Sequence, residues 1–220
     1  MSSSFPALTV ICASLLASLA APLVAQGVSQ LAGKNVSIAQ TMFNGRSAVR
    51  LIAAPDALNG DSYALVKDSS FRDGTIEVDL AGQPAEGAGG GARGFIGIAF
   101  RLQADGRYEY IYLRPTNGRA EDQVRRNHSA QYASHPDYQW QRLRKEEPEK
   151  YESYVDLEPG VWTKMRIVVS GTKVLLYVHG AAQPTLVVND LKLGGGDGGI
   201  GLWIGPGTEA HFSNLSISAQ

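Results

Sequence analysis

The chain has 220 residues, a formal net charge of −1 and a single cysteine. Because its 20 Lys and Arg residues nearly balance its 21 Asp and Glu residues, it lacks the basic surface that nucleic acids or anionic membranes require, and we expect neither as a partner. The cysteine, Cys12, lies in an N-terminal apolar run, so we expect no disulfide or thiolate chemistry in the rest of the chain.

The N-terminus has the pattern of a secretory signal. An apolar run from residue 7 to residue 21 is followed by the helix breaker Pro22 and by Ala25, a small residue typical of a cleavage site. The run is too short for a comfortable membrane span, although an uncleaved anchor stays an alternative because no Lys or Arg precedes it. We therefore predict a signal peptide over 1–25, a single domain over 26–220, and a secreted or periplasmic location with no membrane span after cleavage.

Short segments in which apolar and polar residues alternate follow the predicted signal. A period of two, interrupted by Gly, Asn, Asp or Pro, is typical of antiparallel strands. The segments that we expect to be strands are 49–53, 75–80, 95–102, 108–114, 162–170, 173–179, 200–204 and 211–218. With no convincing amphipathic helix, this series predicts an all-β fold, an antiparallel β-sandwich or jelly roll.

The segment 114–155 departs from this alternation for about forty residues. Unpatterned connections of this length are usually lids, binding loops or disordered segments. This one is rich in Arg, His, Tyr and Trp, and disordered segments are poor in aromatic residues. We interpret it as an ordered functional loop, in which the mixed-charge run 142–152 forms a solvated flap with local ion pairs.

The predicted hairpin of 95–102 and 108–114 has two different faces, because successive strand residues point to opposite sides. One face carries large aliphatic residues and is expected to lie in the core. The other combines small residues with a row of tyrosines: Phe95, Gly97, Ala99, Arg101, Tyr108, Tyr110, Tyr112 and Arg114. Sugars have apolar faces that stack on aromatic rings and hydroxyls that need planar polar groups, so this face suits a glycan. The alternative is that the tyrosines only pack as cross-strand pairs.

We expect the segment 114–155 to fold back over the tyrosine face and enclose a ligand there. The predicted ligand-binding residues are Arg101, Tyr110, Tyr112, Arg114, Arg125, Arg126, Asn127, Tyr138, Trp140 and Trp203. If the protein is an enzyme, the candidate catalytic acid and base groups are His128, His135 and Asp137. The spacing of the two histidines is not typical of zinc sites, and we predict neither a metal nor a cofactor.

Several motifs of core and turn residues carry a resemblance to a known family. They are Phe71–Val78, Gly94–Phe100, Gly160–Arg166, Val174–Val178, Gly199–Gly205 and Phe212–Leu215. Through them the stretch 71–217 resembles the concanavalin A-like lectin/glucanase superfamily. More narrowly, it is similar to the secreted bacterial domains called 3-keto-disaccharide hydrolase-like, or family of unknown function 1080.

The resemblance implies a jelly roll with a concave sheet face that receives carbohydrate. Glucanases of the superfamily use a strand with the pattern Glu-x-Asp-x-Glu. Here Glu77 and Asp79 begin this pattern but Ala81 ends it, so we do not assign a catalytic role to these carboxylates. Retaining hydrolysis needs two suitably placed carboxyl groups.

We therefore predict a secreted carbohydrate-binding domain that recognises an oligo- or polysaccharide under the long loop. One alternative is a glycoside-acting hydrolase of the 3-keto-disaccharide hydrolase-like type. A second alternative is an envelope structural or protein-interaction module, in which the tyrosine face meets a partner chain.

Overall fold

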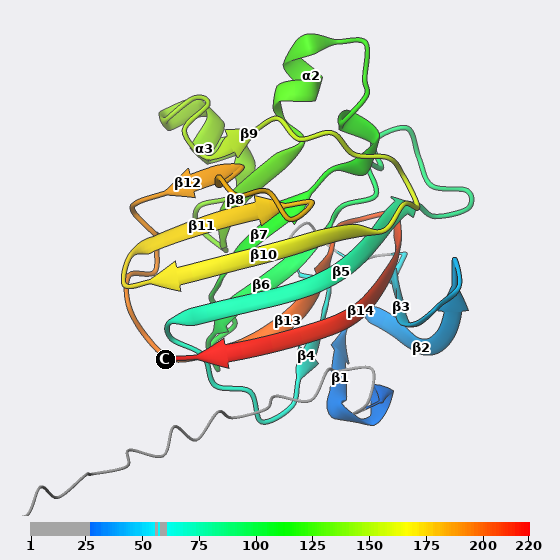
Figure 1. Ribbon diagram of the computed structural model, residues 1–220, viewed down its shortest axis with the longest axis horizontal. Helices are drawn as coiled ribbons and strands as arrows, with labels where there is room; N and C mark the ends of the chain where they lie inside the picture. Colours follow the sequence, from blue (N-terminus) through cyan, green and yellow to red (C-terminus); the bar gives the residue numbers. More distant parts are fainter. Residues whose placement is uncertain (1–26, 56, 58–60) are drawn as a thin grey trace, which may run out of the picture.

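Two antiparallel sheets of seven strands each pack face to face in the computed structural model, which describes residues 27–55, 57 and 61–220. Figure 1 shows the strands of one sheet crossing in front of those of the other, with the helices α2 (Gln123–Asn127) and α3 (Trp140–Glu146) at one end of the sandwich. The predicted all-β jelly-roll class is confirmed. The predicted signal peptide lies outside the described residues.

The first sheet, here called sheet A, contains the predicted hairpin. Its strands in spatial order are β1 (Leu31–Lys34), β4 (Tyr63–Val66), β13 (Gly199–Ile204), β6 (Ile96–Leu102), β7 (Tyr108–Leu113), β8 (Ala130–His135) and β9 (Glu152–Ser153). The second sheet, sheet B, has the order β12 (Leu186–Val188), β11 (Lys173–Val178), β10 (Thr163–Ser170), β5 (Gly74–Pro84), β14 (Thr208–Ala219), β3 (Arg46–Ala53) and β2 (Val36–Phe43).

The core lies between the two sheets and follows the predicted alternation. In sheet A, Ile98 pairs with Ile111 of β7 on one side and with Leu202 of β13 on the other. All three side chains are fully buried, as are Ile76 and Val78 of β5 in sheet B. Since paired residues share a face, each inner face is a continuous apolar surface that the other sheet covers.

The segment 114–155 is not the irregular loop that the sequence predicted. It contains β8, which pairs with β7 over six residue pairs, the short strand β9, and the helices η2 (Pro115–Asn117), α2 (Gln123–Asn127) and α3 (Trp140–Glu146). Strand β8 was missed because neither of its faces is a run of large apolar residues: Ala130, Tyr132 and Ser134 alternate with Gln131, Ala133 and His135.

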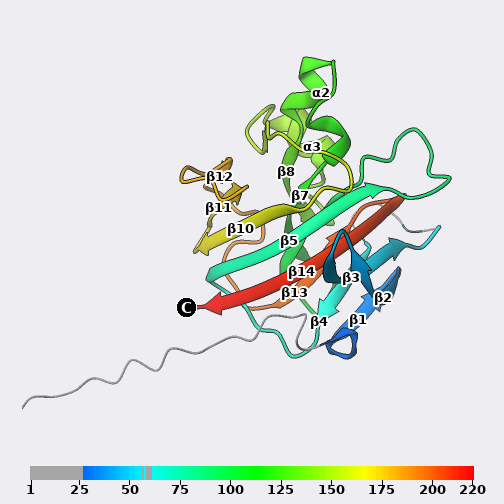
Figure 2. The ribbon, with the colours of Figure 1, turned by 45° about the vertical axis from the view of Figure 1, so that its right-hand side comes forward.

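The helices differ in burial: Pro115 and Asn117 of η2 and Leu143 of α3 are buried, whereas α2 has no buried residue. The N-cap of α2 is Asp122, whose side chain accepts a hydrogen bond of 2.7 Å from the backbone N–H of Arg125. Figures 1 and 2 show α2 and α3 close to the edge of sheet A that β8 and β9 form. None of the helices in the described part of the chain has the length and apolar character that crossing a bilayer requires.

Candidate functional site

An aromatic layer covers the outer face of sheet A. Gly97 of β6 stands in register between Trp203 of β13 and Tyr112 of β7. The rings of these two neighbours meet above it, with centroids 4.8 Å apart, and the Tyr110 ring lies 4.9 Å from the same Trp203 ring. A Cβ at Gly97 would lie 2.1 Å from the carbonyl oxygen of Ile111, so the small-residue floor is what allows the strands and rings to come together.

The chain after β8 lies against this face and buries the tyrosines, which the sequence had placed around a ligand. The Tyr110 hydroxyl donates a hydrogen bond of 2.6 Å to Oε1 of Gln139, which immediately precedes α3. Tyr110, Tyr112 and Trp203 are at most 3% exposed. These three predicted ligand contacts therefore lie beneath the surface, where they support the residues above them.

Arg101 lies away from the other predicted ligand-binding residues, because the alternation of β6 breaks before it. The register of β6 against β13 shifts there, and Arg101 has a φ of 53°, as expected for a bulge that inserts one extra residue. Its guanidinium is buried and donates to the carbonyls of Arg72, Gly171 and Gly194 and to the carboxylate of Asp73. Arg101 thus ties the end of β6 to turns of the sandwich.

A large cleft lies at the end of β7, beside the helices. Its volume is about 1130 Å³, and its walls come from the glycine-rich β5–β6 loop, the β13–β14 turn, α2 with its C-cap His128, and α3. The side chains that give it chemical character are Arg93, Phe95, Arg114, Arg125, His128, Trp140 and Arg144. Four of these residues were predicted site residues, so the cleft holds part of the predicted set.

Arg114 occupies the floor of the cleft directly after β7. One amino nitrogen donates to the Tyr112 hydroxyl at 2.8 Å and to Oε1 of Gln131 at 3.0 Å, and the other donates to the backbone carbonyl of His128 at 2.9 Å. Its ion pair with Glu152 is 3.4 Å long. These contacts leave the Arg114 side chain 6% exposed and fix the orientation of its guanidinium plane.

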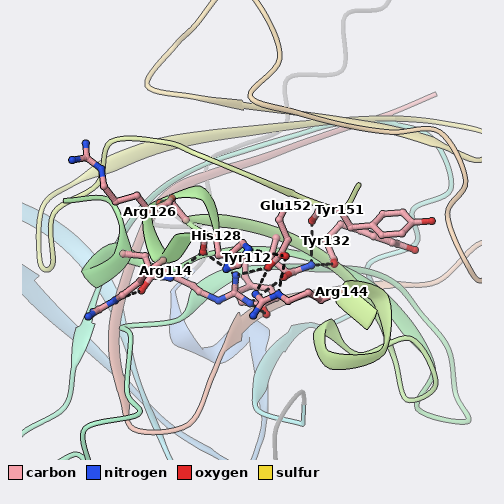
Figure 3. Close-up of polar contacts among 12 residues, drawn as sticks. Tyr112, Arg114, Arg126, His128, Tyr132, Arg144, Tyr151 and Glu152 are labelled. Carbon is pink, nitrogen blue, oxygen red and sulfur yellow. Dashed lines mark hydrogen bonds and ion pairs between the residues drawn. The ribbon is translucent and has the colours of Figure 1, made fainter. Parts of the chain in front are cut away.

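Glu152 of β9 joins several cleft residues. Nε of Arg144 donates to its Oε2 at 2.9 Å, and Nε2 of His128 lies 3.4 Å from the same oxygen. Figure 3 shows Arg114, Arg144 and His128 directed toward this single carboxylate. Glu152 is 3% exposed in its side chain, so one buried anion partly neutralises two arginines.

The pKa of His128 is lowered from its usual value of 6.5, mainly because burial disfavours the charged ring. The charge of Glu152 raises this pKa, and the charges of Arg144 and Arg114 lower it further. The imidazole is therefore neutral at neutral pH. In this state it can donate one hydrogen bond and accept another, or accept a proton from a bound molecule.

Two aromatic side chains provide the apolar walls of the cleft. The guanidinium of Arg144 lies 4.7 Å from the Trp140 ring centroid, and that of Arg114 lies 5.9 Å from it. Phe95 meets the buried Tyr112 ring edge-on at 6.1 Å. The arrangement combines rings with planar hydrogen-bond donors, which suits a ligand with apolar faces and polar edges.

The three predicted catalytic residues do not come together. His128 and His135 stand at opposite ends of β8, on the order of 20 Å apart at the usual rise per strand residue. His135 stacks on Tyr108 with 4.9 Å between centroids, and its Nδ1 lies 3.1 Å from Nε2 of Gln139. Asp137 is exposed. His128 alone of the three lines the cleft.

The remaining predicted ligand-binding residues lie around the cleft, outside its lining. Arg126 packs over the ring of Tyr154 and donates to its hydroxyl at 3.1 Å. Asn127 is exposed at the end of α2. Tyr138 lies beneath the guanidinium of Arg142, 4.2 Å from its ring centroid.

The sequence analysis did not identify three residues of the site, namely Arg93, Arg144 and Glu152. Arg93 lies in the glycine-rich stretch 87–94, which has no alternating pattern of side chains. Arg144 and Glu152 belong to the run 142–152, which the sequence assigned to a solvated flap. That interpretation holds for the exposed pair of Arg142 with Glu146, whereas Glu152 is buried.

Within residues 27–55, 57 and 61–220, no group of three or more His, Cys, Asp or Glu side chains is arranged to hold a metal ion. Glu152, the buried carboxylate beside the cleft, already contacts two arginines and a histidine. The cleft is thus a site for hydrogen bonding, stacking and charge, built mainly from guanidinium groups and rings.

No protein-family model matches the chain, and no curated protein matches it significantly. Among solved structures, it is similar to a carbohydrate-binding module of family CBM66 from Bacillus subtilis, with a TM-score of 0.57, 14% identity, and coverage of 86% of this chain and 96% of that chain. It is also similar to a protein of unknown function with a galectin-like fold from Bacillus subtilis, with a TM-score of 0.52, 12% identity and coverage of 86% and 89%. A third similar structure is a native glycosidic hydrolase, with a TM-score of 0.50, 12% identity and coverage of 90% and 93%.

At these identities the likeness shows the fold alone, a jelly-roll sandwich. The resemblance to the concanavalin A-like superfamily, and the narrower one to 3-keto-disaccharide hydrolase-like domains, stay predictions.

Proposed function

We propose that the chain is a secreted or periplasmic carbohydrate-binding domain that holds a glycan in the cleft at the end of β7. The observation that carries the proposal is the composition of this cleft. Trp140 and Phe95 offer apolar rings, and Arg114 offers a guanidinium whose orientation is fixed by its hydrogen bonds. A volume of about 1130 Å³ exceeds that of an ordinary small-molecule pocket, so the cleft has room for more than one sugar unit.

The fold likeness supports a carbohydrate-related role in general terms, because a carbohydrate-binding module and a glycosidic hydrolase share this architecture. It does not determine where a ligand lies, since function resides in a site and not in a fold. The tyrosine face, which first suggested a glycan platform, contributes indirectly. It holds Arg114 from below through the Tyr112 hydroxyl.

A glycan array followed by calorimetry on the purified protein tests the proposal. We expect binding to at least one oligosaccharide and a loss of about tenfold or more in affinity for Trp140→Ala, because stacking and burial at an aromatic contact are worth roughly 1–3 kcal/mol. Tyr177→Ala is the matched control, since this partly buried tyrosine lies on β11 of the other sheet. If the wild-type protein binds none of the neutral and acidic plant, algal and bacterial glycans, the proposal is refuted.

Glycoside turnover is a second candidate function, favoured by His128, a neutral imidazole in the cleft 3.4 Å from Glu152. Ordinary glycoside hydrolysis uses two carboxyl groups, and Asp122 is the single carboxylate among the described residues that line the cleft. Binding is therefore the better supported function. Product analysis with 3-keto-glycosides and ordinary disaccharides distinguishes the two, because turnover that His128→Ala abolishes would identify an enzyme.

The interaction-module alternative loses the observation that motivated it. It required a tyrosine face open to a partner chain, and Tyr108, Tyr110 and Tyr112 are at most 2% exposed. A partner could not contact these rings without displacing Gln139 and the start of α3.

A further inference from the structure

The cleft carries more positive charge than its carboxylates balance. Four arginines line it, on four different segments: Arg93 on the β5–β6 loop, Arg114 after β7, Arg125 on α2 and Arg144 on α3. Arg114 and Arg144 share the carboxylate of Glu152. The other two have no ion pair with any Asp or Glu of the described residues.

Neutral acceptors fix the orientation of these two arginines. An amino nitrogen of Arg93 donates to the backbone carbonyls of Gly90 at 2.6 Å and Ala92 at 3.1 Å. Nε of Arg125 donates to Oδ1 of Asn117 at 3.0 Å, and one of its amino nitrogens donates to Thr116. These contacts hold the guanidinium groups in place and leave both charges uncompensated.

The remaining acid at the cleft is already engaged elsewhere. The side chain of Asp122 caps α2 by accepting a hydrogen bond from the backbone N–H of Arg125. Asp122 is exposed, so solvent screens its charge. The pKa of Arg93 is lowered, first because of burial and then because of the charges of Arg125 and Arg114. Arginine stays protonated under such shifts, so the three cations repel one another in the absence of a ligand.

Building on the proposed function, we propose that the glycan held in this cleft is acidic and that Arg93 and Arg125 bind its carboxylate or sulfate group. Planar guanidinium groups match both anions, with two parallel hydrogen bonds to a pair of oxygens. Phe95 and Trp140 line the same cleft and provide the contact for the sugar ring that carries the anion. Uronic acids and sulfated sugars share this chemistry.

A nucleic acid fits these observations less well. The chain has a net charge of −1, and the unpaired arginines lie together in one cleft, whereas a duplex is bound by a basic stripe along its backbone. The wild-type protein is therefore tested by calorimetry with four probes at low ionic strength: an oligogalacturonide, the same oligogalacturonide fully methyl-esterified, a sulfated galactan oligosaccharide and a single-stranded DNA oligonucleotide.

We expect at least one acidic oligosaccharide to bind about tenfold or more tightly than the esterified one, because esterification removes the hydrogen bonds between a charged group and the arginines. Raising the salt concentration should weaken this binding. Preference for the oligogalacturonide would identify a carboxylate ligand, and preference for the galactan a sulfate. Equal affinity for the acidic and esterified sugars would overturn the inference and leave the proposed function intact.

Variants locate the anion. Arg93→Gln and Arg125→Gln should each weaken acidic binding about tenfold and weaken any binding of the esterified sugar by a smaller factor. Arg119→Gln is the matched control, because Arg119 is exposed and paired with Asp156 at 2.8 Å outside the cleft lining. If Arg93→Gln and Arg125→Gln bind the acidic sugar as tightly as Arg119→Gln does, the assignment is overturned. If the DNA oligonucleotide binds as tightly as the acidic sugar, the cleft is a generic polyanion site and the inference is overturned. If no glycan binds, both the inference and the proposed function are refuted.

Discussion

The aromatic layer beneath the cleft depends on Gly97, and its substitution by alanine tests this directly. A Cβ there would lie 2.1 Å from the carbonyl oxygen of Ile111 and 2.6 Å from Cα of Tyr112, where 3.4 Å or more is an ordinary contact. Both atoms belong to the backbone of β7, so no side chain can rotate away. Strands β6 and β7 would have to separate by about 1 Å, which weakens their hydrogen bonds in the middle of sheet A.

We expect Gly97→Ala to lower the free energy of unfolding by about 3 kcal/mol, at the upper end of the usual cost of overpacking, because the clash is with backbone. In a domain of this size that corresponds to a fall in Tm of roughly 10 °C. Urea unfolding monitored by fluorescence measures it. Gly90→Ala is the matched control, since a Cβ at Gly90 meets nothing within 4 Å, and its stability should be unchanged or about 0.5 kcal/mol higher. Equal stability of the two variants would refute this account of the layer.

Two further predictions concern Glu152 and His135. Glu152→Gln should lower the free energy of unfolding, measured by urea unfolding, by about 3 kcal/mol, since it leaves the buried Arg114 without its carboxylate. It should also strengthen the binding of acidic glycans in calorimetry. Glu158→Gln is the control at an exposed ion pair and should change neither stability nor binding. The pKa of His135 is lowered from 6.5 mainly by burial, so the unfolded chain binds its proton more readily and stability must fall as the pH drops below about 6.5. Wild-type stability measured from about pH 7 to about pH 5 should fall relative to His135→Gln, and parallel curves would contradict the assignment.

The sequence predicted those strands whose two faces differ. In β5, β6 and β7 the apolar core residues alternate with others, so their approximate bounds and the β6–β7 hairpin were found. No residue of β2 is fully buried, and β8 mixes alanines with polar residues on both of its faces, so neither strand shows a clear alternation of large apolar residues. The fold class survived these omissions because it depends on the number of strands and on the turns between them.

The site was harder to predict because tertiary pairing decides it. Alternation placed Arg101 beside Gly97 and Ala99, and a bulge that no local pattern marks moved it away. Arg114 was predicted because it ends a strand whose face was already identified. Arg93 follows glycines that give no side-chain pattern, and Glu152 lies in a run of alternating charges in which only the fold distinguishes a buried carboxylate from solvated ones.

The two pairs of arginines in the cleft differ in how their charge is balanced. Arg114 and Arg144 share a buried carboxylate. The amino groups of Arg114 are fully used in hydrogen bonds within the protein, so Arg144 presents the donors with reduced charge beside the Trp140 ring, an environment suited to hydroxyls. Arg93 and Arg125 keep their full charge and are held by neutral acceptors, an environment suited to an anion.

Because hydrogen bonds already fix all four guanidinium groups, binding would cost little side-chain entropy. An acidic sugar bound in this way would point its carboxylate or sulfate toward the β5–β6 loop and α2, with its apolar face against α3. A neutral sugar would lack this directional constraint, and the repulsion among Arg93, Arg114 and Arg125 would remain unrelieved.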